Sequence, residues 1–307
     1  MIGTRSSKLA LWQANHIKGL IEERFPEISV ELKHITTKGD KILDVPLAKI
    51  GGKGLFTKEL ESEMLTGSID LAVHSLKDMP TELPPGLVLA AITKRENPLD
   101  AFVSNNYDSF AKLPQGAKVG TSSLRRKAQL LSKRPDLEIS DLRGNVDTRL
   151  GKLDNGGLDA IILAAAGLKR LGYDSRITEV LPEDICLPAV GQGALAVEAR
   201  SGDKEVLEIL SFLHDECTGV EALAERAFLR EVEGGCQVPV GVHALCSGET
   251  VSIKAIISSL DGKKILKQQM DGASSDAEQL GRMLARKMLL AGGKEIMAQL
   301  GAFCKEQ

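Results

Sequence analysis

The alternation of short apolar runs with amphipathic stretches constrains the fold of this chain more than any other feature of its sequence. Within residues 1–93, apolar residues recur every three or four positions over Lys8–Arg24, which predicts a helix. Short apolar runs over Ile69–Val73 and Leu87–Ile92 predict buried strands. The same stretch holds one further expected strand and one further expected helix, Val30–Ile35 and Phe56–Leu65. Such β/α alternation indicates a doubly wound sheet with helices on both faces.

The alternation begins again after Pro98 and predicts a second α/β unit in tandem with the first. The run over Asp159–Ala165 is almost wholly apolar, as expected of a strand that is covered on both faces. The connections near Thr93–Leu99 and Leu187–Gly193 are predicted hinges, and Ala194–Ala199 is expected to return a strand to the first unit. The other expected elements are strands over Ala101–Val103, Lys118–Gly120 and Leu137–Leu142, a helix beginning at Ser123 or Leu124, and a helix capped by Asn145.

The last third of the sequence predicts a small α+β domain. A long amphipathic helix over Gly219–Glu233 is followed by three strand-like runs, separated by turn residues, and by a closing helix over Ala277–Leu290. The three strands, expected to form an antiparallel sheet, cover Val238–Leu245, Val251–Ser258 and Lys264–Met270. The predicted domains are therefore residues 1–93 plus 194–212, residues 99–187 and residues 217–307.

The composition of the chain disfavours several classes of function. A net charge of −3 and a pI near 6.0 are unlike the basic footprint of a nucleic-acid-binding protein. Aromatic residues make up only 3% of the chain and offer few stacking surfaces for bases. No apolar run reaches membrane-spanning length, and Met1–Arg5 does not resemble a signal peptide. We therefore expect a cytoplasmic protein that binds neither nucleic acid nor membrane.

Cysteine and histidine usage predicts no metal site. The five cysteines are odd in number and form no CxxC pair. The five histidines form no i,i+4 pair, which a helical metal site would use. Free thiols are expected instead, as is usual for proteins of a reducing compartment.

Basic residues are concentrated in one segment, Lys118–Arg176. It holds 12 Lys+Arg and 7 Asp+Glu, a net charge of +5, whereas the whole chain carries −3. Its arginines lie among turn and cap residues: Arg125 and Arg126 follow Thr121-Ser122-Ser123, and Arg143, Arg149 and Arg170 come later. Backbone N–H groups, hydroxyls and guanidinium forks at strand–helix junctions favour an anion site. The segment therefore predicts a pocket for a small ligand with several carboxylates or phosphates; the alternative is a set of solvated charges on helix faces.

A second candidate site follows the predicted strand Ile69–Val73, in the phrase His74-Ser75-Leu76-Lys77-Asp78. Ligands of open α/β sheets bind beyond the carboxyl ends of the strands. Lys77 is suited to hold a carboxylate, and Asp78 is suited to act as a base or to stabilise a cation. A surface Lys–Asp pair in a loop is the alternative. His74 and Ser75 lack the nucleophile elbow of a hydrolase.

Two glycine-rich phrases complete the candidate sites. Lys49–Phe56 lacks the Ser or Thr that follows the lysine of a phosphate-binding P-loop, so we expect a lid that carries Lys49 and Lys53. In Gly234-Gly235-Cys236, two glycines precede the cysteine on a loop, which favours an accessible sulfur. A thiolate there is suited to attach a group covalently, while a buried, unreactive thiol is the alternative.

These phrases, taken with several others, closely resemble those of the porphobilinogen deaminases, a family also called the hydroxymethylbilane synthases. They occur in the order typical of the family, over residues 3–241. They are Gly3–Ser7 with Leu9, Ala10 and Gln13, Gly51–Phe56, Val73–Asp78, Gly120–Arg126, Leu142–Val146, Thr148–Leu150, Ala166–Arg170, Pro188–Gly193 and Glu233–Pro239. Because the sequence after Leu245 holds no such phrase, the last domain is inferred from its strand and helix pattern.

The resemblance implies a fold, a cofactor and a reaction. The fold is two domains similar to periplasmic binding proteins, followed by a third, smaller domain. The cofactor is a dipyrromethane joined by a thioether to Cys236. In the reaction, four porphobilinogen molecules condense head to tail with loss of ammonia, and water releases the linear tetrapyrrole hydroxymethylbilane. The product is expected to pass to uroporphyrinogen-III synthase, and the enzyme is expected to be a monomer.

The resemblance also implies roles for individual residues. Asp78 matches the catalytic aspartate of the family, suited to stabilising the cationic azafulvene that forms when ammonia leaves. Phe56 is expected to stack on a pyrrole. Each porphobilinogen carries an acetate and a propionate, so the growing chain is a polycarboxylate. Its expected binders are Arg5, Ser7, Lys49, Lys53, Ser75, Lys77, Thr121, Ser122, Ser123, Arg125, Arg126, Arg143, Arg149 and Arg170.

One departure from the family and two alternatives remain. Only Met1 and Ile2 precede the Gly-Thr-Arg phrase, so the first strand is expected to be very short, or the protein to start upstream. A solute-binding or ligand-sensing protein of the same two-lobed fold accounts for the arginines but not for Cys236 or Asp78. A nucleic-acid-binding protein accounts only for the basic segment. A covalent adduct on Cys236, visible as added mass, separates the deaminase from both.

Overall fold

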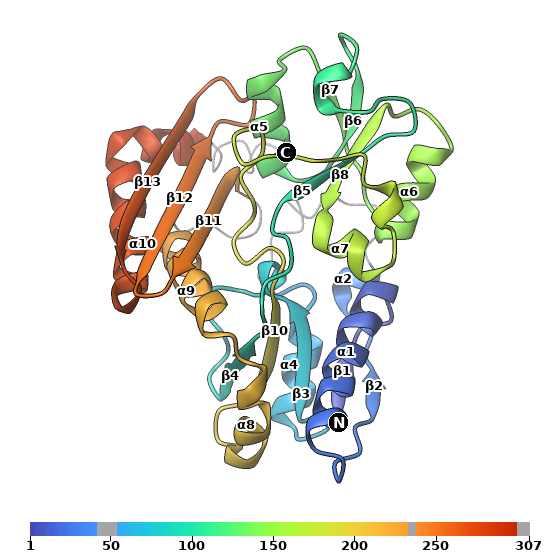
Figure 1. Cartoon of the computed structure of the whole chain (residues 1–307), viewed down its shortest axis with the longest axis vertical. Helices are drawn as coiled ribbons and strands as arrows, with labels where there is room; N and C mark the ends of the chain where they lie inside the picture. The colour runs from blue at the N-terminus through green and yellow to red at the C-terminus, as the bar shows by residue number, and fades with distance from the viewer. Residues whose placement is uncertain (42–53, 233–237, 300–307) are drawn as a thin grey trace.

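The computed structural model of the chain describes residues 1–41, 54–232 and 238–299 (Figure 1). The described residues form three sheets, two with five strands and one with three. We call each sheet, with the helices packed on it, the first, second or third lobe in chain order. Lys49 and Lys53 of the expected lid, and Cys236, lie outside the described residues.

The first lobe is built on a sheet with the strand order β2-β1-β3-β10-β4. β1 is parallel to β2 and β3, whereas β10 is antiparallel to β3 and β4. The strands are β1 (Ile2–Thr4), β2 (Leu32–His34), β3 (Leu71–Ser75), β4 (Leu87–Ile92) and β10 (Leu195–Arg200), and the helices are α1 (Lys8–Arg24), α2 (Lys38–Lys41), α4 (Lys58–Leu65) and α8 (Lys204–Leu210).

Most of these elements agree with the sequence pattern. α1 and β4 have the predicted bounds, and α1 begins at Lys8 because the Ser7 hydroxyl accepts a hydrogen bond from the Ala10 N–H at 3.3 Å. The strand predicted over Ile69–Val73 is wrong by two residues at each end, because β10 pairs with β3 as far as Ser75. His74 and Ser75 therefore belong to the strand rather than to the loop after it.

The second lobe repeats this arrangement, with the strand order β7-β6-β8-β5-β9. β6 is parallel to β7 and β8, and β5 is antiparallel to β8 and β9. Its strands are β5 (Asp100–Val103), β6 (Lys118–Gly120), β7 (Glu138–Ser140), β8 (Ala160–Ala164) and β9 (Glu179–Val180), and its helices are α5 (Leu124–Lys133), α6 (Val146–Asp154) and α7 (Ala165–Arg170). The side chains of Ser123 and Asn145 cap α5 and α6, as predicted.

The first two lobes are joined by two crossings of the chain (Figure 1). One leads from β4 into β5, and the other leads back from the second lobe into β10, which confirms the strand expected over Ala194–Ala199. Each crossing thus delivers an antiparallel strand to the lobe that it enters. The crossings also contact each other, because the Glu96 N–H donates to Gly193 O at 3.2 Å and the Gln192 amide donates to Pro98 O at 2.6 Å.

The third lobe is an antiparallel sheet of β11 (Val240–Ser247), β12 (Thr250–Ser258) and β13 (Ile265–Ala273), packed against α9 (Glu216–Glu231) and α10 (Ala277–Met288). α9 and α10 approach closely at Gly281, where a Cβ atom would lie 2.1 Å from Ala224 O. Only glycine fits there without moving a helix. The predicted three-stranded sheet with its two flanking helices is confirmed.

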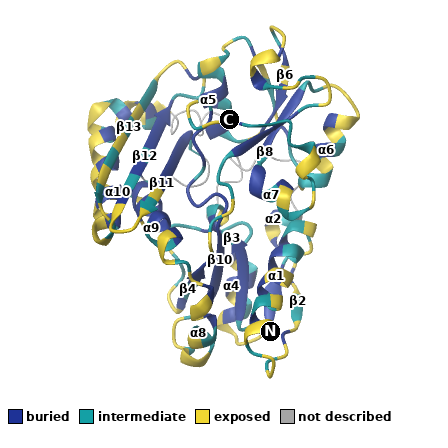
Figure 2. Cartoon of the chain, in the orientation of Figure 1, coloured by how far each residue is buried: buried dark blue, intermediate teal, exposed yellow. Residues whose placement is uncertain are grey.

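Buried residues follow the strands and one face of the helices (Figure 2). Phe102 and Phe228, both fully buried, lie in the cores of the second and third lobes. The predicted class, two doubly wound α/β units with a small α+β unit, is confirmed. Over residues 1–41, 54–232 and 238–299, no helix has the length and apolarity needed to cross a membrane, and no three His, Cys, Asp or Glu side chains gather as a metal ion would require.

Candidate active site

The turn that carries Asp78 follows directly on β3, at the edge of the sheet where the crossings lie. Leu76–Asp78 forms a short 3-10 turn, anchored by the buried Leu76, whose N–H donates to Ala194 O at 3.0 Å. Asp78 is exposed. The Lys77 ammonium donates to the Gln192 side chain at 3.4 Å. Burial lowers the pKa of Lys77 to about 8, with Arg126 adding to the effect and the Asp78 carboxylate opposing it.

Arg125 and Arg126 share one buried carboxylate, Asp100, at the start of β5. An Nη atom of each guanidinium lies 2.7 Å from an Asp100 oxygen, and all three side chains are at most 7% exposed. Burial alone would raise the pKa of Asp100, but the two cations outweigh it and hold that pKa far below its ordinary value. The Gln192 amide also donates to Asp100, at 2.9 Å, so the arginine pair is tied to the second crossing.

The hydroxyls of Thr121, Ser122 and Ser123 are engaged in local hydrogen bonds at the start of α5. Ser123 Oγ accepts from the Arg126 N–H at 3.4 Å, and Thr121 Oγ1 accepts from the Ser123 N–H at 3.2 Å. Ser122 Oγ donates to Leu142 O at 3.1 Å and accepts from the Leu142 N–H at 2.9 Å. These bonds fix the strand–helix junction beside the arginine pair.

Arg143 and Arg149 bring further positive charge to the same region. The Arg149 Nε donates to Gly144 O at 2.8 Å. Burial lowers the pKa of Arg149 to about 10, with Arg126 and Arg143 adding to the effect and Asp78 opposing it. Arg143 Nη1 is buried and has no hydrogen-bond partner among the described residues. Arg149 is thus close enough to Arg126, to Arg143 and to Asp78 of the first lobe to interact with each of them electrostatically.

The first lobe contributes a second group of predicted binders. Arg5 forms a two-pronged ion pair with Asp40, and its guanidinium carbon lies 4.2 Å from the centroid of the Phe56 ring. Ser75 Oγ accepts a hydrogen bond from the Gln13 amide at 2.8 Å. Arg5 is therefore held between an internal carboxylate and the aromatic ring that was expected to stack on a pyrrole.

Arg170 links the lobes at the second crossing. It lies at the end of α7 and donates to Gly193 O at 2.6 Å, and its guanidinium carbon lies 5.8 Å from the centroid of the Trp12 ring of α1. Burial lowers the pKa of Arg170 to about 10, against the opposing charge of Glu96. An ion pair of 3.2 Å between Lys8 and Asp147 joins α1 to α6 in addition.

The structure brings most of the predicted residues together, but sequence reasoning missed the groups that hold them. Asp100, Gln192, Asp40 and Gln13 each contact a predicted binder. Of these, Gln192 lies in the Gly-Gln-Gly phrase that marks the second crossing, and an acidic residue at the start of an apolar strand was a signal for Asp100. Gln13 belongs to the first of the phrases that carry the family resemblance, whereas Asp40 had no comparable signal.

The donors present fit a polycarboxylate cofactor such as a dipyrromethane. Burial lowers the pKa values of Lys77, Arg149 and Arg170, so a nearby anion would stabilise the charged form of each. Arg143 Nη1, buried and without a hydrogen-bond partner among the described residues, adds a donor. Ligand carboxylates would supply both the charge and the acceptors.

Fold and site together define a two-lobed α/β protein with a third α+β lobe, which concentrates guanidinium and ammonium groups between its first two lobes. A family model described as the dipyromethane cofactor binding domain of porphobilinogen deaminase matches residues 1–208, and one described as the C-terminal domain of porphobilinogen deaminase matches residues 220–290. The chain belongs to the porphobilinogen deaminase family. It is a transferase of tetrapyrrole biosynthesis with a dipyrromethane cofactor, which joins porphobilinogen units into hydroxymethylbilane.

Relatives of known identity agree over almost the whole chain. The porphobilinogen deaminase of Geobacter sulfurreducens is 56% identical over 299 residues, which are 97% of this chain and 94% of that one. That of Prochlorococcus marinus strain MIT 9312 is 54% identical over 302 residues, 97% and 96% of the two chains. Among solved structures, the methionine binding protein MetQ superposes with a TM-score of 0.45 at 14% identity, over 69% of this chain and 87% of that one. That superposition is too loose to add to the fold derived from the sheets.

Proposed function

We propose that the reaction takes place between the first two lobes, with Asp78 as the catalytic carboxylate. The observation that supports this most directly is the crowding of cations around it. Lys77 precedes Asp78 on the same turn, and Arg149 of the second lobe lies within electrostatic reach of Asp78. Arg126 and Arg143 lie within reach of Arg149 in turn. A carboxylate placed among these cations, at the start of the space between the lobes, is suited to stabilise a positive charge that develops on a substrate ring.

We propose distinct roles for the two kinds of charge. When ammonia leaves porphobilinogen, the substrate becomes a cationic azafulvene, and the Asp78 carboxylate stabilises that cation. After the new carbon–carbon bond forms, a pyrrole carbon must lose its proton, and Asp78 is suited to accept it. The surrounding cations, Lys77, Arg125, Arg126, Arg143, Arg149 and Arg170 with Arg5, hold the acetate and propionate groups and so orient the rings.

We propose Cys236 as the attachment point of the cofactor. When bound, the dipyrromethane supplies the terminal pyrrole to which the first substrate ring is joined. Ser7, Ser75, Thr121, Ser122, Ser123, Lys49 and Lys53 stay proposed binders as well, and Phe56 a proposed stacking partner. In support, Ser75 closes β3 two residues before Lys77, and Phe56 already stacks on Arg5.

Exchange of Asp78 for asparagine tests the role of its charge. Asp78→Asn keeps the shape of the side chain and loses the charge, so single-turnover kinetics should show a loss of about 10²–10³ in the chemical step. Asp174→Asn is the matched control, because Asp174 is also an exposed aspartate in a 3-10 turn. A change in Asp78→Asn that is confined to the Michaelis constant would refute a chemical role for Asp78.

Intact mass tests the attachment site independently of turnover. The purified chain should exceed its sequence mass by two deaminated porphobilinogen units, and Cys236→Ala should have the bare mass. Cys217→Ala, at an exposed thiol of α9, should keep the adduct and serves as the control. A Cys236→Ala protein that still carries the added mass would place the attachment elsewhere.

We also propose that the chain acts as a cytoplasmic monomer of three domains, residues 1–93 plus 194–212, 99–187 and 217–307, and that its product passes to uroporphyrinogen-III synthase. Light scattering after gel filtration should give a mass near the 32.9 kDa of one chain. A dimer mass at micromolar concentration would contradict that expectation.

A further inference from the structure

One face of α9 is turned toward the segment that carries Asp78. Ala222, Arg226 and Arg230 are spaced four residues apart, so their side chains lie on the same face of the helix. Ala222 is fully buried and packs in one apolar cluster with Leu76 and Met79, the residues that flank Lys77 and Asp78. Ala222 therefore supports the Leu76–Asp78 turn through apolar packing.

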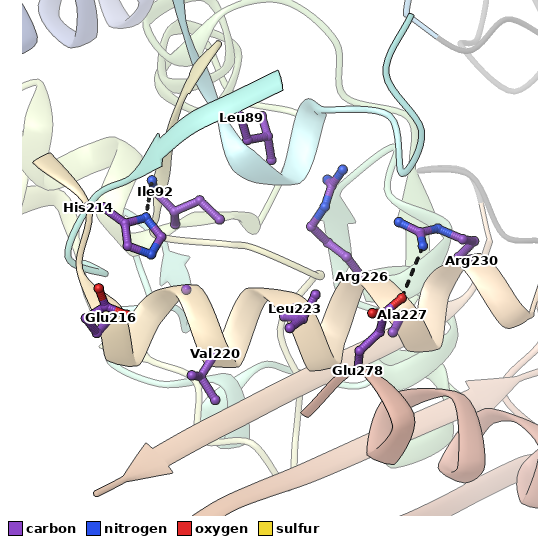
Figure 3. Close-up of a pocket in the computed structure, with 11 residues that line it drawn as sticks. Leu89, Ile92, His214, Glu216, Val220, Leu223, Arg226, Ala227, Arg230 and Glu278 are labelled. Atoms are coloured by element: carbon purple, nitrogen blue, oxygen red, sulfur yellow. Dashed lines mark hydrogen bonds and ion pairs between the residues drawn. The ribbon is translucent and has the colours of Figure 1, made fainter. Parts of the chain in front are cut away.

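The next two turns of the same face hold the backbone just after Asp78. Arg226 Nη2 donates to Pro80 O at 2.7 Å, and Arg230 Nη2 donates to Thr81 O at 3.0 Å. Arg226 is only 8% exposed, whereas the Arg230 side chain is 40% exposed and also lies 3.6 Å from Glu278 of α10. Figure 3 shows the two guanidinium groups rising from α9 on the same side. Arg226 is thus the sheltered member of the pair and Arg230 the solvated one.

A cavity of 370 Å³ lies beside these arginines, between α9 and β4. Leu89, Ile92, Val220 and Leu223 line it together with Arg226 and Arg230 (Figure 3). Apolar packing holds Met79, whereas Pro80 and Thr81 are only half-buried. The two charged hydrogen bonds to Pro80 and Thr81 restrain the backbone there, since hydrogen bonds from an ionised donor are the stronger kind.

We propose that Arg226, assisted by Arg230, is a positioning residue for the reaction. It fixes the backbone of Pro80 and thereby the place of Asp78 relative to α9. The chain leaves α9 at Glu231, five residues before Cys236, so one helix holds the catalytic segment and leads directly into the cofactor-bearing sequence. This inference rests on the proposed roles of Asp78 and Cys236. A small displacement of Asp78 would then slow the chemical step, while the cations would bind the substrate carboxylates as tightly as before.

The test is the variant Arg226→Met in the cofactor-loaded enzyme, with Arg226→Lys as the conservative variant. Methionine keeps much of the apolar stem and loses every donor, and the neighbouring cavity gives the site room to relax. We expect a normal cofactor mass, a Michaelis constant within about twofold of the wild type and a fall in kcat of about tenfold, because misplacement of a reacting group by an ångström can cost up to ~10²-fold. Arg226→Lys should recover part of kcat, since it keeps one donor and the charge.

Arg286→Met is the matched control, because Arg286 forms an exposed ion pair with Glu231 at the end of α9, and no hydrogen bond or ion pair among the described residues joins it to the segment around Asp78. It should leave kcat within about twofold, as exposed ion pairs contribute little. The double variant Asp78→Asn/Arg226→Met tests whether Arg226 acts through Asp78 or independently of it. If Arg226 acts through Asp78, the second substitution should add little to the loss caused by the first.

The possible outcomes divide cleanly. Normal turnover in Asp78→Asn contradicts the proposed role of Asp78 itself. Slow turnover in Asp78→Asn together with a full, multiplicative further loss from Arg226→Met leaves that role intact and overturns the positioning role. An unchanged kcat in Arg226→Met, or a loss explained by missing cofactor mass, overturns it as well. If Arg226→Met is not recovered folded, Arg226→Lys decides: the expected partial fall in kcat with normal cofactor mass supports the proposal, and wild-type kinetics refute it.

Discussion

Replacement of Asp100 by asparagine should reveal how much of the stability of the second lobe depends on one carboxylate. Asp100 is completely buried and compensates two guanidinium groups, Arg125 and Arg126, which are 5% and 6% exposed. Asparagine keeps the shape and one acceptor oxygen but removes the charge. Both cations then remain buried without their carboxylate, which is the costly way to break an ion pair.

The magnitude follows from that burial. Removing one partner of a buried pair costs about 3–5 kcal/mol, against a total stability of about 5–15 kcal/mol. With an m-value of about 3 kcal/mol per molar urea, the unfolding midpoint should fall by about 1–1.7 M. The pKa of Asp100 is held far below its ordinary value, so its contribution is present above the unfolded pKa of 3.8 and is lost only in acid. The deficit of Asp100→Asn should therefore be constant from about pH 5 to pH 9.

The assay is urea unfolding of the cofactor-free protein followed by circular dichroism. Asp136→Asn is the matched control, because Asp136 also pairs with an arginine at 2.7 Å but its side chain is 25% exposed. That control should lose about 1 kcal/mol or less. The cofactor-loaded form of Asp100→Asn should lose less than the free form, because ligand carboxylates can take over part of the compensation. A loss below about 1 kcal/mol in the cofactor-free protein would refute the assignment of Asp100 as the compensating charge.

Four further expectations concern charge and packing. Lys77 has a pKa of about 8 in the free protein, so it is cationic below that pH and neutral above it; the rate of cofactor loading should fall above pH 8, and Lys77→Arg should remove that fall. Arg149→Leu and Arg170→Leu should load cofactor yet stall at particular chain lengths, each by about ten- to hundredfold, which native mass spectrometry after a pulse of porphobilinogen would show; a wild-type distribution would mark them as ordinary charges. Asp40→Asn removes the carboxylate that pairs with Arg5, so that Arg5 can bind the substrate instead. The longest intermediate should then be released more slowly, as the same mass spectra would show. Phe102→Ala should cost about 3–5 kcal/mol in thermal unfolding, with kcat per folded molecule unchanged.

Local signals explain where the sequence predicted the fold well. The helix Lys8–Arg24 has both a 3.6-residue period and a serine cap, and its bounds were predicted without error. β3 was misplaced because its end depends on β10, which lies more than a hundred residues further along the chain. A strand boundary set by a distant partner leaves no trace in the local pattern.

The same limit applies to the site. Residue type and position at element ends predicted the concentration of arginines, because guanidinium groups near strand–helix junctions have a direct chemical meaning. No local pattern predicts that Asp100 pairs with Arg125 and Arg126 or that Asp40 pairs with Arg5. The partners are separated by 25, 26 and 35 residues along the chain. The hydrogen bond from Arg226 to Pro80 O joins residues 146 positions apart, and the sequence did not predict it either.

These internal carboxylates change how the site must work. Arg125, Arg126 and Arg5 are already compensated by Asp100 and Asp40 before any ligand arrives. Arg149 and Arg170, whose pKa values burial lowers, and Arg143, whose Nη1 has no hydrogen-bond partner among the described residues, are groups that a ligand carboxylate would stabilise. Each porphobilinogen adds two carboxylates, so under the proposed roles a lengthening chain uses up these groups and then competes with Asp40 for Arg5. We therefore expect the number of cations that the protein offers to restrict the length of polypyrrole that it holds, an expectation that the Asp40→Asn variant tests directly.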